Sequence, residues 1–300
     1  MLERPASWLR DPEYARNRQR LLATRQTAPG AACVAVFGSS RVVVGVSTEP
    51  ATNGEPIVAN FGHIGGGPLH ELLALRRLLA DGPKPDAVIV EFWPPFVVDG
   101  PLGNEDTRVL PSRLRGSDLA VFHGRFDADW RAARLTPWYG HRYFLLSQLV
   151  PVWLLPAHRY DSSWAFVTKP SNVDPDSAVR QTTRSGHDFW PTTSVVTLTS
   201  RQAFQELFAD CRAAGIRSAL VWLPESSEFR AGYTLEIDAA MRAFANELAC
   251  QQNVPFIDAR AWQPDGDFVD GFHLSHIGAV GFTERLRREA ARLVTRSEQP

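Results

Sequence analysis

Residues 32–40 read Ala-Cys-Val-Ala-Val-Phe-Gly-Ser-Ser, an apolar run that stops at a glycine and two serines. A short run of this kind predicts a strand with both faces buried, as in a parallel sheet. Similar apolar runs follow along the chain, so we expect five strands, over residues 32–37, 56–61, 86–92, 218–223 and 255–258.

Segments with the spacing of amphipathic helices lie between these strands. Residues 68–80 carry leucines at helical intervals and end at Asp81-Gly82-Pro83, a helix stop. We expect further helices over 200–214 with Ser200 as N-cap, over 234–252, and from just after Ser275 to about residue 296. Strands and helices that alternate in this way predict right-handed βαβ units. The expected fold class is α/β: a three-layer α/β/α, doubly wound, five-stranded parallel sheet of the flavodoxin-like type.

The region 96–195 breaks this alternation, because it is rich in Trp, Pro, Arg and His. We interpret it as a helical insertion after the third strand, with helices over 117–135 and 141–155. The α/β domain then comprises 31–95 and 196–300, and residues 1–30 form a partly helical lead-in. The aromatic residues of the insertion could form a lid over an acyl chain, a floor for a sugar, or an internally packed subdomain; for most we expect core packing.

Charge and hydropathy argue against several partners. The formal net charge is −1 and the arginines form no basic tract, so we expect no nucleic-acid partner. The N-terminal residues lack the apolar stretch of a signal peptide, and the longest apolar segment, 143–156, is too short to span a bilayer. Its part 143–155 is the candidate for contact with lipid, although it lacks a clear polar face. Cys33, Cys211 and Cys250 fit the free thiols of a reducing compartment, so we expect a cytoplasmic protein.

Candidate catalytic residues stand at the expected carboxyl ends of the strands, where ligands bind in such sheets. Ser40 follows the first strand, and a serine needs a neighbouring base to act as a nucleophile. Near the C-terminus, Asp270-Gly271-Phe272-His273 offers His273 as that base and Asp270 as the carboxylate that orients its ring. The alternatives are that Ser39 and Ser40 only cap the next helix, and that His273 is a loop histidine beside a capping aspartate.

A glycine cluster follows the second strand, at residues 62–67. Its bare N–H groups could receive an oxyanion, and the rival interpretation is a phosphate loop. The cluster lacks the order G-x-G-x-x-G and any G-K-[ST], which favours an oxyanion role for one glycine. No three protein ligands stand at a spacing typical of zinc, so we expect neither a metal nor another cofactor.

Together these segments resemble the SGNH (GDSL-like) hydrolase superfamily, in order and across most of the chain outside the insertion. Gly38-Ser39-Ser40 looks like the first block of that family, with Ser40 as nucleophile. Residues 60–65 look like the second block, with Gly65 as the oxyanion glycine that works beside the N–H of Ser40. Asp270-x-x-His273, followed by Gly278, looks like the last block, which carries orienter and base. The resemblance implies a doubly wound α/β/α sandwich, in agreement with the element order above.

The chain departs from the family pattern in two places. Ser39 stands where the family has the Asp of Gly-Asp-Ser, and the Asn of the third block is absent from Glu91-Phe92-Trp93-Pro94-Pro95, just past the third strand. One oxyanion donor is therefore unaccounted for. Gly-Ser-Ser with such a third block is similar to the branch that contains the D-alanine-transfer proteins of teichoic acid assembly and polysaccharide O-acetyltransferases. That similarity raises acyl transfer beside hydrolysis.

These residues predict a serine-dependent ester hydrolase or O-acyltransferase that acts through an acyl-enzyme on a small-molecule, glycan or acyl substrate. The alternative is a catalytically degenerate binding or scaffold protein of the same fold. Further residues at this edge of the sheet are candidate substrate contacts: Ser39, Arg41, His63, Trp93, Glu225 and Arg230. For Glu225 and Arg230, an ion pair within a solvated loop is the alternative.

Overall fold

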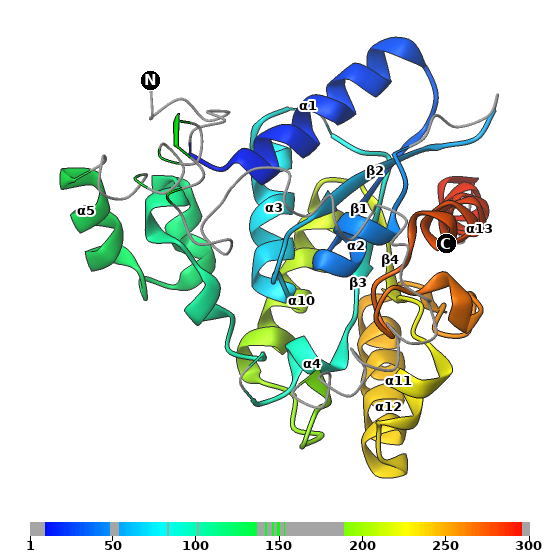
Figure 1. Cartoon of the computed structure of the whole chain (residues 1–300). Helices are drawn as coiled ribbons and strands as arrows, with labels where there is room; N and C mark the ends of the chain where they lie inside the picture. The colour runs from blue at the N-terminus through cyan, green and yellow to red at the C-terminus, as the bar shows by residue number, and fades with distance from the viewer. Residues whose placement is uncertain are drawn as a thin grey trace.

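The computed structural model describes residues 10–48, 54–82, 84–100, 102–136 and 189–295, together with Arg142, Leu146, Leu149, Val150 and Trp153. Within these residues no helix is both long and apolar enough to cross a membrane. The structure is shown in Figure 1.

A five-stranded parallel sheet forms the centre of the molecule (Figure 1). The strands lie in the order β2-β1-β3-β4-β5, which is the flavodoxin-like order. The predicted strands are confirmed to within one residue at each end; their bounds are β1 Cys33–Gly38, β2 Ile57–Gly62, β3 Ala87–Glu91, β4 Arg217–Trp222 and β5 Phe256–Asp258.

Helices cover both faces of the sheet, so alternate residues of each strand enter different cores. Cys33, Ala35 and Phe37 of β1 belong to the larger core, whereas Val34 and Val36 belong to the smaller one. The larger core is covered by α1 (Pro12–Thr27), α3 (Pro68–Ala80), α10 (Leu198–Ala213) and α12 (Leu235–Gln252). The smaller core is covered by α2 (Ser40–Gly45) and α13 (His276–Thr295). The expected three-layer, doubly wound α/β architecture is therefore confirmed.

The helix starts show one correction. Ser200 was expected as the N-cap of α10, but the cap is Thr197, whose side chain accepts a hydrogen bond from the N–H of Ser200 at 3.0 Å. The capping residue lies three positions before the amide that it satisfies, so the helix begins at Leu198. The expected cap Ser275 does accept from the N–H of Gly278, at 3.2 Å, at the start of α13.

The region after β3 contains short helices, and their bounds are α4 Pro94–Val97, η1 Glu105–Arg108, η2 Pro111–Arg113, η3 Gly116–Phe122 and α5 Asp127–Leu135. The single helix expected over 117–135 is wrong, because His123 adopts a left-handed conformation (φ 50°) and ends η3. The helix expected over 141–155 falls within 137–188, where the structure describes only the five single residues named above.

The two ends of the expected insertion lie side by side. Val98 and Val196 form an antiparallel bridge, and the N–H of Thr197 donates to the carbonyl of Val97 at 2.9 Å. The chain therefore leaves the sheet after β3 and returns at the same place. Two short elements, α11 (Ser227–Ala231) and η8 (Asp265–Asp267), complete the described structure.

Candidate active site

Ser40 lies where β1 turns sharply into α2. Ser39 is the N-cap of α2, because its Oγ accepts a hydrogen bond from the N–H of Arg41 at 3.2 Å. Ser40 is consequently the first residue of the helix, and its own N–H donates to none of the described residues. The turn requires Gly38, since a Cβ there would collide with the side chains of Val42 and Glu91.

The structure brings Ser40, His273 and Asp270 together, although 233 positions separate Ser40 from His273. The Ser40 Oγ lies 2.9 Å from His273 Nε2, and His273 Nδ1 lies 2.7 Å from Asp270 Oδ2. The other oxygen of Asp270 accepts the main-chain N–H of His273 at 2.7 Å. Asp270 therefore holds both the backbone and the ring of the histidine, and the ring in turn faces the serine.

Residues 62–67, hereafter the glycine loop, follow β2 beside this triad. The N–H of Gly66 donates to the carbonyl of His63 at 2.9 Å, and Gly65 lies third in the resulting turn with φ +70°. A positive φ at that position is typical of a type II turn and favours glycine. The N–H of Gly65, like that of Ser40, donates to none of the described residues. Two backbone donors are therefore available at the edge where the triad lies.

Asn60 links the glycine loop to α2 through hydrogen bonds. Its Nδ2 donates to the carbonyls of Val42 and Val46 at 2.8 and 2.9 Å, and its Oδ1 accepts the N–H of Gly62 at 2.9 Å. Because one buried side chain binds both segments, the distance between α2 and the start of the glycine loop is fixed.

Arg41, the residue after Ser40, is buried. Its Nη1 pairs with Glu91 Oε1 at 3.2 Å, and its Nη2 donates to the carbonyls of Leu223 and Pro224 at 2.9 and 2.8 Å. Its Nε donates to the carbonyl of Phe272, the residue before the triad histidine, at 3.3 Å. One guanidinium thus connects the ends of β3 and β4 to the histidine loop.

Glu225 accepts three hydrogen bonds on one buried oxygen. Its Oε1 lies 3.2 Å from Trp93 Nε1, 3.1 Å from Trp222 Nε1 and 3.0 Å from the hydroxyl of Tyr233. Burial raises the pKa of Glu225, and the nearby Arg41 opposes that rise. Trp93 follows β3, in the segment where the family resemblance implies an Asn. Its indole N–H binds Glu225 and is therefore not free to bind a ligand.

The six expected substrate contacts are placed differently from one another. Ser39, Arg41, Trp93 and Glu225 are buried and hydrogen-bonded to protein groups, although Glu225 Oε2 has no hydrogen-bond partner among the described residues. Arg230 is half-buried and donates to main-chain carbonyls of Glu225 and Arg260, so an ion pair between Glu225 and Arg230 in a solvated loop is wrong. His63 is also partly exposed, with 23 % of its side chain accessible.

Sequence reasoning missed Glu91 and Asn60 as parts of this site. Glu91 Oε2 accepts the N–H of Ser39 at 2.6 Å, which fixes the turn before Ser40. A charged residue at the end of an otherwise apolar strand, as in Asp86-Ala87-Val88-Ile89-Val90-Glu91, is the signal that could have identified it. Among the described residues, no group of three His, Cys, Asp or Glu side chains could hold a metal ion.

Comparison with known proteins adds one structural likeness. No protein family model matches the chain, and no curated protein matches it. The solved structure of a lipase/acylhydrolase from Enterococcus faecalis is similar over 90 % of this chain and 100 % of its own, with 15 % sequence identity and a TM-score of 0.39.

Proposed function

We propose that the protein is a serine-dependent enzyme of the SGNH type that acts on an ester or acyl group, as a hydrolase or an O-acyltransferase. The observation that carries this proposal is the continuous set of contacts from Ser40 Oγ through the His273 ring to Asp270, at 2.9 and 2.7 Å. Both lie within the range of a working nucleophile, base and orienter.

The triad can perform two successive transfers. Ser40 Oγ attacks the acyl carbonyl while its proton passes to His273 Nε2, and Asp270 stabilises the resulting imidazolium. The tetrahedral intermediate collapses when the leaving oxygen takes that proton from His273, which gives the acyl-enzyme. Water or an acceptor hydroxyl then attacks the ester carbonyl, gives its proton to His273, and releases the acyl group as Ser40 regains its proton.

Two backbone donors support the developing oxyanion in this scheme. They are the N–H groups of Ser40 and Gly65, to which no described residue offers an acceptor. A third donor of the kind the family resemblance implies is not supplied by Trp93, whose N–H binds Glu225. Loss of one such donor typically lowers the rate by about a hundred- to a thousand-fold, so we expect modest turnover with simple esters.

Labelling with a fluorophosphonate probe, read by intact mass, tests the proposal. We expect one adduct on the wild-type protein and none on S40A or H273A. The matched control is S218A. Ser218 is a buried serine near the start of β4, away from the carboxyl ends of the strands, so this variant should label normally. An adduct that survives in S40A would show that Ser40 is not the nucleophile.

A second measurement separates hydrolysis from transfer. Products are analysed when a competing alcohol is added at increasing concentration to a turnover reaction. If the acyl-enzyme reacts with hydroxyl acceptors, the ester of that alcohol accumulates at the expense of the free acid. Free acid alone at every alcohol concentration would restrict the function to hydrolysis.

The position of Trp93 favours a second candidate, a binding or scaffold protein that has lost turnover. The Trp93 side chain fills the place after β3 where the family resemblance expects an oxyanion donor. Such a protein would give no adduct on folded wild type, which is the opposite of the result expected above.

A further inference from the structure

The glycine loop is held by more contacts than a surface turn needs. The N–H of Gly65 belongs to the same peptide unit as the carbonyl of Ile64, and no described peptide bond is cis. In a trans peptide the C=O and the N–H point in opposite directions. Whatever binds the Ile64 carbonyl therefore decides where the Gly65 N–H points.

His63 binds that carbonyl. Its Nδ1 lies 3.0 Å from the Ile64 oxygen, and its own main-chain N–H donates to the carbonyl of Gly38 at 2.8 Å. The backbone of His63 is thus fixed to the end of β1, two residues before Ser40. Its ring is the group that sets the orientation of the following peptide.

The next peptide unit is fixed from the other side. Arg108 of η1 donates from Nε to the carbonyl of Gly65 at 2.6 Å and from Nη2 to the carbonyl of Leu102 at 2.7 Å. Its Cδ would lie 3.2 Å from a Cβ on Gly65. The two peptides that flank the Gly65 Cα each have their carbonyl bound, while the Gly65 N–H has no protein acceptor among the described residues.

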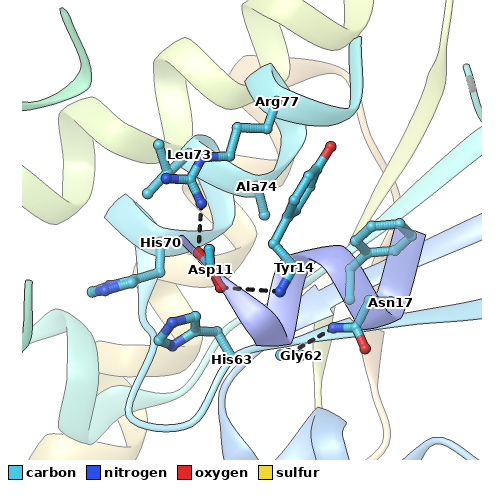
Figure 2. A pocket seen from close by; sticks show the side chains of 10 residues that line it. Asp11, Tyr14, Asn17, Gly62, His63, His70, Leu73, Ala74 and Arg77 are labelled. Atoms are coloured by element: carbon cyan, nitrogen blue, oxygen red, sulfur yellow. Dashed lines mark hydrogen bonds and ion pairs between the residues drawn. The ribbon is translucent and has the colours of Figure 1, made fainter. Parts of the chain in front are cut away.

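The outer nitrogen of the His63 ring is held by α1. Its Nε2 lies 3.1 Å from Glu13 Oε2, and Asn17 of the same helix donates to the carbonyl of Gly62 at 3.2 Å. Figure 2 shows the His63 ring beside that of His70, with the start of α1 above both. The helix therefore contacts the glycine loop at two points, one of them through the ring.

Both ring nitrogens of His63 face oxygen acceptors, the Ile64 carbonyl and the Glu13 carboxylate. A doubly protonated ring donates to both, whereas a neutral ring has one proton for two acceptors. Burial lowers the pKa of His63, which Glu13 of α1 and the N-cap Asp11 oppose, while His70 of α3 and Arg113 of η2 add to the lowering. As the pH rises, the ionised Glu13 competes for the remaining proton, because a carboxylate is the stronger acceptor.

We propose, on the basis of the function proposed above, that His63 is a positioning residue for catalysis. Its ring, oriented by Glu13 of α1, holds the Ile64 carbonyl so that the Gly65 N–H is directed at the oxyanion. A bound carbonyl also polarises its peptide, which makes the N–H at the opposite end a better donor. The helix α1, which precedes the sheet in sequence, is by this route part of the catalytic machinery.

Substitutions at His63 test the hydrogen bond. H63L cannot bind Ile64, so at about pH 5 we expect kcat to fall by about ten- to a hundred-fold with KM within about twofold, because a transition-state contact is misdirected. H63N places an amide N–H near the position of Nδ1 and should restore most of kcat. Thermal melts show whether both variants are folded. If H63L fails to fold, the kcat of H63N decides whether the hydrogen bond to Ile64 supports catalysis.

A pH profile tests the role of Glu13. Effects of pH that two variants share cancel in the ratio of their kcat values. We expect the ratio of wild type to H63N to fall between about pH 5 and about pH 9, as the His63 proton turns toward Glu13. In E13Q the glutamine amide can donate an N–H to His63 Nε2, which keeps the ring proton on Nδ1. The ratio of kcat in E13Q to kcat in H63N should therefore be independent of pH.

The matched control is R113Q, which removes the other ion pair of Glu13, at 3.3 Å, and leaves its contact with His63. R113Q also removes a cation that lowers the pKa of His63, so we expect it to match the wild type in kcat to within about twofold at about pH 5, where the ring is doubly protonated in both proteins. If the wild type is active and H63L has the same kcat, the positioning role of His63 is overturned and the Ser40 mechanism is left intact. Absence of a Ser40 adduct on folded wild type would overturn both proposals.

Discussion

Two adjacent serines in this chain have different structural duties. The Ser39 side chain caps α2, and the Ser40 side chain meets His273. The sequence left open that both serines only cap the helix, and in the structure the cap is on Ser39 while Ser40 contacts His273. The cap is what places Ser40 at the first helical position, where its N–H is left without an intrahelical acceptor.

At the residue scale, a single carbon added at Gly65 tests the role of its N–H. G65A must adopt φ +70° and place a Cβ 3.2 Å from Arg108, so we expect both strain and a turned peptide. The strain should lower the free energy of unfolding by about 1–3 kcal/mol, and kcat should fall by about a hundred-fold. Steady-state kinetics and urea unfolding measure the two effects.

The control for that substitution is G30A. Gly30 also has a positive φ, +89°, and a Cβ there would meet nothing within 4 Å. We expect G30A to show a similar loss of stability with kcat unchanged. If G65A turned over as fast as G30A, the Gly65 N–H would not be an oxyanion donor.

The candidate site could be predicted from sequence where a role depends on a short local pattern. Asp270 and His273 are three residues apart, and Ser40 follows an unmistakable strand end. The contacts of Arg41 and Glu91 could not be predicted in this way, because they depend on which strand ends lie side by side in the folded sheet. Burial of a charged pair is a tertiary property that no local spacing encodes.

At the scale of elements, helix interiors were easier to predict than helix ends. The spacing of leucines identified α3 over its full length, whereas the start of α10 was placed at Ser200. The first turn of α10 begins with Leu198, whose side chain is exposed and therefore falls outside the buried stripe that the prediction followed. The break at His123 was missed for another reason: a non-glycine residue rarely adopts a left-handed conformation.

The cap of α10 gives a prediction at this scale. T197A removes the oxygen that accepts the Ser200 N–H, so we expect the free energy of unfolding to fall by about 1 kcal/mol. S200A leaves that acceptor in place and should cost less. Urea unfolding of the two variants ranks them, and a larger loss in S200A would contradict the cap assignment.

At the scale of the whole molecule, the sheet could be predicted because its strands are buried on both faces. Such strands read as continuous apolar runs, and the two cores divide each run by alternate residues. The path of the chain after β3 could not be predicted in detail, because three of its described elements, η1, η2 and η3, are short 3₁₀ turns.

Global stability should depend on pH through Glu71, a buried residue in the first turn of α3. Its Oε2 has no hydrogen-bond partner among the described residues, and burial, followed by Glu91 and Glu105, raises its pKa well above the ordinary value of 4.5. A raised native pKa contributes stability that is fully present below the ordinary value and is lost as the pH rises through the native one. We therefore expect E71Q to raise the free energy of unfolding at neutral and alkaline pH.

Urea unfolding between about pH 5 and about pH 9 measures this effect, and the E71Q curve should be flatter than that of the wild type. E284Q on the exposed side of α13 is the control and should follow the wild type. An E71Q protein that loses stability relative to wild type at alkaline pH would mean that Glu71 is ionised and paired when folded.

The position of α1 has a consequence for how molecules of this protein meet one another. The outermost strands of the sheet are β2 and β5. The strand β5 has three residues and ends at Asp258, which pairs with two arginines, whereas β2 has six residues, all buried, and α1 packs along it. An uncovered apolar edge of that length is a template for aggregation through intermolecular strand addition. A molecule in which α1 detached would therefore lose the hold on its glycine loop and become prone to self-association in the same event.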